Sequence, residues 1–209
     1  MIIGFTGKQG SGKDFVAFLI GEELEKRNLG VYYKYAYADN LKQFIFNIWG
    51  TYSNTQEEKK IEVETTNVLG KEKNKTVRTL LQEVGQAIRK VDQNAWIKAL
   101  VNIIKENMPN SGIALITDVR YQNEADICDI VIRVQRKSSS NELKGNEKLH
   151  LSETEQDGIK VDFTINNNTD NETPWMDELI DYIVESKRQN QEEKNVIDEK
   201  YKDCSVTRL

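Results

Sequence analysis

The sequence contains few of the residues that build cross-links, metal clusters and membrane spans. Among its 209 residues there are only two cysteines, two prolines and one histidine. Two cysteines are too few for a disulfide framework or a zinc knuckle. No apolar run approaches the roughly 20 residues that a membrane-spanning helix needs. An excess of basic residues is also lacking, since the net charge is −5, which argues against a general nucleic-acid coat protein.

The remaining composition is that of one globular domain. Apolar residues make up 38% and charged residues 30% of the chain, which allows a sizeable core under a polar surface. Because the sequence passes directly into an apolar strand, we expect no signal peptide and a location in the cytoplasm, the host's cytoplasm if a phage encodes the protein. We expect no membrane and no nucleic-acid partner, and the sequence leaves a homodimer open.

The most informative stretch is a glycine loop between a predicted strand at residues 1–6 and a predicted helix that runs to about residue 27. Glycines let backbone N–H groups turn toward an anion, and the following helix N-terminus adds partial positive charge. A lysine at the end of such a loop reaches the β- and γ-phosphates of a nucleoside triphosphate. We therefore predict ATP binding by Gly7, Lys8, Gln9, Gly10, Ser11, Gly12, Lys13 and Asp14.

Asp14 stands where such loops usually carry a serine or threonine that binds Mg²⁺. A carboxylate is also a hard oxygen ligand for Mg²⁺, so we favour a metal role for Asp14. The alternative is that Asp14 only complements the dipole of the helix that it begins. The two roles are compatible.

Further periodic segments predict alternating helices and strands. We expect strands at residues 31–37, 113–117, 130–134 and 161–165, and helices starting at Asp39-Asn40 and covering 77–91, 94–107 and 174–200. Residues 50–76 are charged and lack a clear period, so they predict a mobile excursion with some helix. Strands separated by helices predict an α/β protein, a three-layer α/β/α sandwich with a five-stranded, mainly parallel sheet.

Two polar residues follow the predicted strand at 113–117. Asp118 lies at the carboxyl end of this strand, where an acid beside a phosphate loop holds Mg²⁺ through a water. Arg120 lies two residues later, and its guanidinium suits phosphate oxygens. The plainer alternatives are a turn aspartate and a surface salt bridge from Arg120 to Glu124 or Asp126.

The predicted helix at 77–91 carries a polar stripe beside its apolar one, formed by Arg78, Gln82, Gly85 and Arg89. Offsets of four, three and four residues put these side chains on one narrow arc. Arginines bind phosphate and an amide reads a base edge, so the stripe predicts substrate binding. Gly85 costs helix stability, which indicates a close approach by a ligand or by backbone. The alternative is a solvated edge.

A basic, polar segment between the last two predicted strands is typical of a flexible flap. It begins at Arg136 and includes Lys137, Lys144, Lys148 and His150. Such a flap closes over a transferring phosphate and brings cations to it. Arg136 is the best candidate because it is nearest to the predicted strand. We assign no catalytic role to the lone histidine.

These residues together resemble the deoxynucleoside monophosphate kinases of tailed phages. The matching stretches are GKQGSGKD at residues 7–14, YADNLK at 37–42, VRTLLQEVG at 77–85 with Trp96, TDVRYQNE at 117–124, Arg136, HLSE at 150–153 and 162–166. The resemblance covers most of the chain. It implies a P-loop nucleoside-monophosphate-kinase-like fold and transfer of the ATP γ-phosphate to a deoxynucleoside monophosphate, with ATP as donor and Mg²⁺ as cofactor.

The resemblance also implies roles for parts of the chain. Lys13, Asp118, Arg120 and Arg136 would be catalytic, Asp14 and Asp118 would hold the metal, and Lys42 would join the stripe in binding the acceptor. Within a single domain at 1–209, the acceptor part would cover 37–108, the flap 136–152, and a charged tail 186–209. Two alternatives remain: a kinase of another phosphorylated acceptor, as in phosphomevalonate kinases, which also carry GKD, or a non-catalytic nucleotide-binding protein.

Overall fold

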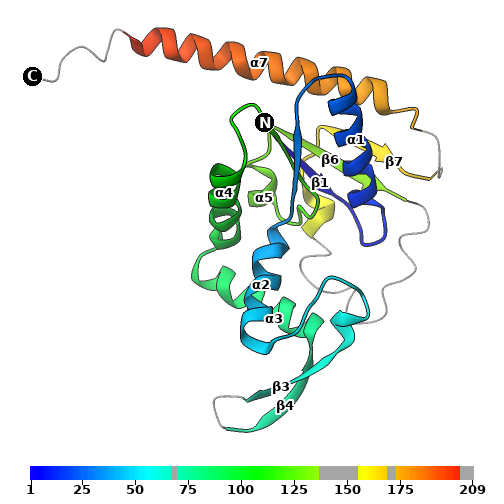
Figure 1. Ribbon diagram of the computed structural model, residues 1–209, viewed down its shortest axis with the longest axis vertical. Helices are drawn as coiled ribbons and strands as arrows, with labels where there is room; N and C mark the ends of the chain where they lie inside the picture. The colour runs from blue at the N-terminus through cyan, green and yellow to red at the C-terminus, as the bar shows by residue number, and fades with distance from the viewer. Residues whose placement is uncertain (67–69, 137–154, 169–172, 203–209) are drawn as a thin grey trace, which may run out of the picture. The chain divides into compact units, whose positions relative to one another are not determined.

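The computed structural model describes residues 1–66, 70–136, 155–168 and 173–202, with side chains to residue 189 in the last range (Figure 1). The chain forms two compact units. The sheet unit comprises Met1–Tyr33 and Asn110–Leu209, and the helical unit comprises Lys34–Pro109. The helical unit nearly coincides with the segment at 37–108 that the sequence assigns to the acceptor.

The sheet has five strands in the order β2-β5-β1-β6-β7. Their bounds are β1 Ile2–Thr6, β2 Tyr32–Tyr35, β5 Ile113–Ile116, β6 Ile130–Gln135 and β7 Phe163–Asn166. β1 pairs in parallel with β5, where Ile2 opposes Ala114, and with β6, where Ile3 opposes Ile130. β6 and β7 are also parallel. Neighbouring strands that are distant in sequence are the arrangement expected for crossover connections.

Helices cover both faces of this sheet. Alternation along β1 turns Ile3 and Phe5 toward one face, where they join a buried cluster with α1 (Lys13–Lys26) and α7 (Met176–Lys202). Gly4 faces the other way, and a Cβ there would lie 2.6 Å from Cys128 Sγ, just after the short helix α5 (Gln122–Ala125). The predicted three-layer α/β/α fold class is therefore confirmed.

The helical unit contains α2 (Tyr37–Trp49), α3 (Val77–Val91) and α4 (Ala95–Asn107). α3 has the predicted bounds. It begins at Thr76, whose hydroxyl accepts a hydrogen bond from the Thr79 N–H at 3.2 Å and so satisfies one of the N–H groups left open at a helix start. α2 begins two residues before the predicted Asp39, with no side-chain cap at Ala36. Ile45, Val77 and Leu80 form the core of this unit.

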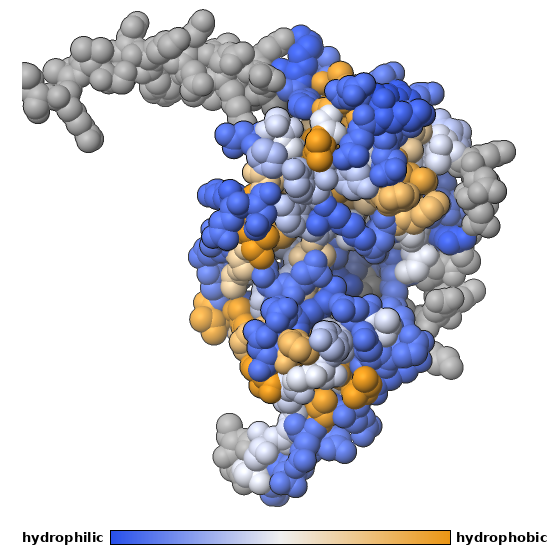
Figure 2. Space-filling model, viewed as in Figure 1, coloured by the Kyte–Doolittle hydropathy of each residue, from blue (hydrophilic) through white to orange (hydrophobic). Residues whose placement is uncertain are grey.

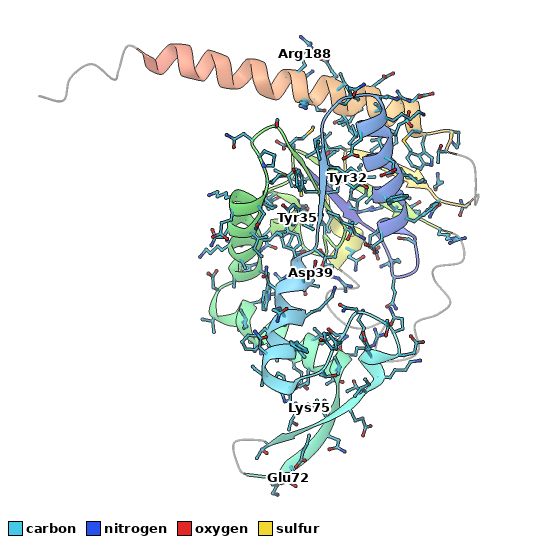
Figure 3. The ribbon with its side chains drawn as sticks, viewed as in Figure 1. Tyr32, Tyr35, Asp39, Glu72, Lys75 and Arg188 are labelled. Carbon is cyan, nitrogen blue, oxygen red and sulfur yellow. The ribbon has the colours of Figure 1, made fainter. Side chains whose placement is uncertain are left out.

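For residues 50–76 the sequence predicted some helix but missed a β-hairpin. The segment contains a short 3-10 helix, η1 (Glu58–Lys60), and an antiparallel hairpin of β3 (Glu62–Thr66) and β4 (Glu72–Thr76). Figure 3 labels Glu72 and Lys75 on the hairpin. Lys75 forms an ion pair with Glu83 of α3. Only Val63 and Thr65 of β3 are half-buried, so the strand lacks an apolar face that the sequence pattern could reveal.

The C-terminal helix α7 begins two residues later than predicted. Leu179, Ile180 and Ile183 are buried against the sheet unit's core. Lys187 donates to the Leu29 carbonyl at 2.9 Å, just beyond the end of α1.

The view in Figure 2 shows a largely hydrophilic surface on which hydrophobic side chains form separate patches. In the described part of the chain, no helix combines the length and the apolar character required to cross a membrane.

Candidate phosphate-binding site

The glycine loop, residues 7–12, connects β1 to α1 and adopts a conformation that only glycine readily supplies. Gly7, Gly10 and Gly12 have φ angles of 137°, 78° and 89°. A Cβ on Gly7 would lie 2.2 Å from the Val134 carbonyl oxygen of β6, so this position also needs glycine for space. Gly12 is the N-cap of α1. The loop thus delivers the chain directly into a helix N-terminus, where backbone N–H groups favour an anion.

Lys13 folds back onto this loop. Its ammonium donates to the Gly7 carbonyl at 2.6 Å and to the Lys8 carbonyl at 3.0 Å. The Ser11 N–H donates to the same Lys8 carbonyl at 3.2 Å. A positive charge is therefore held at the loop itself, the position that binding of a phosphate by Lys13 requires.

Two buried hydroxyls accompany the loop. Thr6 and Ser11 are fully buried, and within the described residues neither hydroxyl oxygen has a hydrogen-bond partner. Ser11 Oγ lies 3.2 Å from where a Cβ on Gly7 would be. A buried hydroxyl without a partner is costly. A bound anion would offer the Ser11 hydroxyl an acceptor.

Asp14 lies beside the carboxyl end of β5. Its Oδ1 accepts a hydrogen bond from the Thr117 hydroxyl at 3.1 Å, and Asp118 is the next residue. The Val119 N–H donates to the Phe5 carbonyl at 3.1 Å, so residues 117–119 run next to the end of β1, where the loop begins. The fold thus brings the region of both predicted acids to one edge of the sheet.

A metal site made by protein ligands alone is not formed there. Over the described ranges, no cluster contains three or more histidine, cysteine, aspartate or glutamate residues that could hold a metal ion. Mg²⁺ is commonly bound by one or two carboxylates together with substrate phosphates and water. Asp14 and Asp118 supply hard oxygen donors of that kind.

Arg120 is half-buried and follows the same strand end. Glu124, which is 1% exposed, accepts hydrogen bonds from the backbone N–H groups of Arg120 at 2.8 Å and Tyr121 at 3.2 Å. The buried carboxylate therefore fixes the backbone that carries Arg120 and caps α5 at the same time.

A cavity of about 400 Å³ adjoins the loop within the sheet unit. Its walls include Gly7 and Lys8 of the loop and the predicted Arg136 at the end of β6. Lys8 forms an ion pair of 2.7 Å with Asp157 of η3 (Glu155–Gly158). The polar side chains that line the cavity are Lys8, Arg133, Gln135, Arg136, Gln156, Asp157, Asn166 and Asn168.

Among the residues of this region that the sequence did not predict, Arg133 and Asn167 hold the site together. Arg133 donates to the carbonyls of Gln156 at 3.1 Å and Ile159 at 2.8 Å, and so holds η3 as a wall of the cavity. Asn167, just after β7, donates to the Ser11 carbonyl at 2.9 Å. The arginine inside an otherwise apolar strand was a signal for the first residue. No local pattern indicates the second.

The polar stripe on α3 belongs to the helical unit. Arg78 donates to Gln56 Oε1 at 2.5 Å, and Arg89 donates to the Gln93 carbonyl at 3.5 Å. Gln82 is half-buried between them along the helix. Lys42 of α2 forms an ion pair of 2.7 Å with Asp39, one turn away. The contacts of Arg78, Arg89 and Lys42 are all made with residues of the helical unit itself.

Gly85 has close neighbours on α2 and α4, two other helices of its unit. The residue is buried, and a Cβ there would lie 3.1 Å from Leu41 Cδ2 of α2. The Trp96 indole N–H of α4 donates to the Gly85 carbonyl at 3.3 Å. The sequence predicts a ligand or backbone next to this glycine, whereas the neighbour in the structure is the Leu41 side chain. Its assignment to substrate binding gains no support from these contacts.

Most of the predicted flap lies outside the described residues. Arg136 is its only predicted cation within them, while Lys137, Lys144, Lys148 and His150 fall in the range 137–154.

No family model and no curated protein matches the chain. Among solved structures, the crystal structure of TT1252 from Thermus thermophilus is similar over 81% of this chain and 90% of that chain, with 14% sequence identity and a TM-score of 0.42. A likeness this remote says nothing of function.

Proposed function

We propose that this protein is a Mg²⁺-dependent kinase that transfers the γ-phosphate of ATP to a deoxynucleoside monophosphate. The observation that supports it most strongly is the ammonium of Lys13, held at 2.6 and 3.0 Å from two carbonyls of the glycine loop, at the N-terminus of α1. A cation, glycine-supplied amides and a helix N-terminus at one place form the usual chemistry of a triphosphate site.

The chemical step needs positioning and charge stabilisation more than covalent catalysis. An oxygen of the acceptor's phosphate forms a bond to the γ-phosphorus of ATP. The bond from that phosphorus to the β,γ-bridging oxygen breaks, so ADP leaves and a deoxynucleoside diphosphate forms. Lys13, Arg120 and Arg136 stabilise the negative charge that spreads over the transferring group.

The carboxylates of Asp14 and Asp118 fit the metal, because both are hard oxygen donors at the same sheet edge. When bound, Mg²⁺ neutralises charge on the phosphate oxygens. The Thr117 hydroxyl orients the Asp14 carboxylate for this role, through its 3.1 Å hydrogen bond.

Acceptor binding is assigned to the helical unit. Arg78 and Arg89 supply charge for a monophosphate, Lys42 adds a further cation, and Gln82 offers an amide that can read a base edge. Arg78 and Arg89 are both half-buried on α3, which limits the rotamers that binding has to fix.

The deciding experiment measures ATP turnover with Mg²⁺ and each of the four deoxynucleoside monophosphates, with phosphomevalonate, and with no acceptor. The proposal expects ADP and a deoxynucleoside diphosphate in at least one of the first four reactions. Turnover only with phosphomevalonate would replace the acceptor class. Tight MgATP binding without turnover in any reaction would indicate a non-catalytic nucleotide-binding protein instead.

A further inference from the structure

Asn167 connects the edge of the sheet to the glycine loop across a sequence separation of 156 residues. It directly follows β7, and its backbone N–H donates to the Gln135 carbonyl at 2.8 Å, which continues the pairing of β7 with β6. Its side-chain amide donates to the Ser11 carbonyl at 2.9 Å. The backbone of Asn167 is thus fixed by the sheet while its side chain holds the loop.

This contact sets the direction of a specific loop amide. In a planar trans peptide, the carbonyl and the N–H of the next residue point in opposite directions. Because the Ser11 carbonyl is held toward Asn167, the N–H of Gly12 is held away from it. Gly12 is also the N-cap of α1, so this amide belongs to the group that presents itself to an anion.

The conformational freedom of Gly12 explains why the contact from Asn167 is useful. Glycine populates positive and negative φ about equally, so the φ of 89° at Gly12 is available but not enforced by the residue itself. A Cβ on Gly12 would lie 2.3 Å from Asn167 Nδ2. The absence of a side chain therefore makes the peptide adjustable and also admits the amide that holds it in place.

We propose that Asn167 is a positioning residue for triphosphate binding, which fixes the Ser11–Gly12 peptide so that the Gly12 amide is aimed before the ligand arrives. This inference rests on the proposed function, because it assumes that the loop binds the phosphates of ATP. Preorganised donors bind charge more strongly, since no reorganisation is required when the ligand arrives.

The test compares Asn167→Ala and Asn167→Asp with the wild-type protein. The alanine variant removes the donor, and the loss of one hydrogen bond of ordinary strength corresponds to about a 10-fold rise in the Kd and KM for MgATP. The aspartate variant keeps the shape, but its carboxylate faces the Ser11 carbonyl and adds negative charge near the phosphates. We expect it to bind MgATP more weakly than the alanine variant does.

A positioning role predicts a split between the two substrates. The KM for the deoxynucleoside monophosphate should stay within about twofold of wild type, since the acceptor is bound by other residues. Asn110→Ala is the matched control, because Asn110 is exposed in a turn of the sheet unit and should leave both constants unchanged. Calorimetry with MgATP and a thermal melt of each variant complete the set.

The outcomes separate the two proposals. Wild-type protein that neither binds nor turns over MgATP overturns the proposed function and this inference with it. Wild-type protein that binds MgATP, with both Asn167 variants binding equally well, overturns this inference alone. Equal losses for both substrates together with a lowered melting temperature would assign Asn167 a purely structural role, as would failure of both variants to fold.

Discussion

Replacing Asp14 with asparagine separates its metal role from its role at the helix start. The side-chain oxygen of the introduced asparagine can still accept the hydrogen bond that Thr117 donates at 3.1 Å, so the change removes one negative charge and little else. Asp14 is exposed in the first turn of α1, and its replacement leaves no cavity. The variant should fold normally.

The two roles predict effects of different size. If Asp14 only complements the helix dipole, its loss costs about 0.3–1 kcal/mol, and for a chain of this size this lowers the melting temperature by less than about 4 °C. If Asp14 helps to hold Mg²⁺, perturbing the metal's ligand environment costs about 10- to 100-fold in metal affinity or activity. We expect the larger, kinetic effect.

The assay titrates Mg²⁺ against the rate of ATP turnover at saturating ATP and acceptor, beside a thermal melt. The Mg²⁺ concentration at half-maximal rate should rise about 10-fold or more in Asp14→Asn. Glu178→Gln is the matched control, since Glu178 is an exposed acid in the first turn of α7 and should alter only the melting temperature. Unchanged Mg²⁺ dependence in Asp14→Asn would refute the metal role, and Asp14 would then act only at the helix start.

Four further predictions concern separate features. Lys13→Ala should reduce turnover by at least about 100-fold with a normal melting curve, because it removes a cation that stabilises developing charge; near-normal rates would contradict the loop's assignment. Arg78→Ala and Arg89→Ala should raise the KM for the deoxynucleoside monophosphate while calorimetry finds unchanged MgATP affinity, and wild-type kinetics in both would make the stripe a solvated edge. Gly85→Leu should lower the free energy of unfolding in urea by about 1–3 kcal/mol, because it overpacks against Leu41; a purely kinetic effect would argue against packing as the reason for this glycine. Burial raises the pKa of Cys128 from 9.0 to about 12, so the free energy of unfolding should fall as the pH rises above about 9, where the unfolded thiol ionises first; this decline should be shallower in Cys128→Ala.

The sequence predicted the helices and strands whose hydrophobic pattern follows from their burial. α3 has the expected bounds because its apolar stripe is unbroken and Thr76 provides an N-cap at its start. The central strands β5 and β6 were recognisable because every residue of β5 is buried and a strand buried on both faces reads as a continuous apolar run.

The hairpin of β3 and β4 was not predicted, because its strands are largely exposed. Glu62, Glu64 and Thr66 are exposed on one face, and β4 is exposed over Glu72, Lys73 and Asn74. Its pairing depends on backbone hydrogen bonds and cross-strand neighbours, which leave no hydrophobic alternation in the sequence. α5 is too short to have a recognisable period.

The candidate site also has parts that the sequence predicts and parts that it does not. The glycines of the loop indicate positive φ angles in the sequence itself, because such angles favour glycine. The contacts from Thr117, Arg133 and Asn167 come from strands that are distant in sequence, so they follow only from the register of the sheet. At Gly85 the sequence predicted a close approach by a ligand or by backbone, whereas the structure places the Leu41 side chain there.

The order of strands in the sheet has a consequence for how the protein is synthesised. β1 lies between β5 and β6, and its residue Ile2 pairs with Ala114 while Ile3 pairs with Ile130. During translation, β1 is therefore complete long before either of its hydrogen-bonding partners leaves the ribosome. The helical unit is encoded between β1 and β5, so its local contacts can form in that interval. The apolar side chains of Ile3 and Phe5 meanwhile still lack the elements that bury them. Nascent chains stalled before residue 113 should accordingly expose a hydrophobic strand that chaperones bind, and those extended beyond Ile183 of α7, which completes the buried cluster, should not.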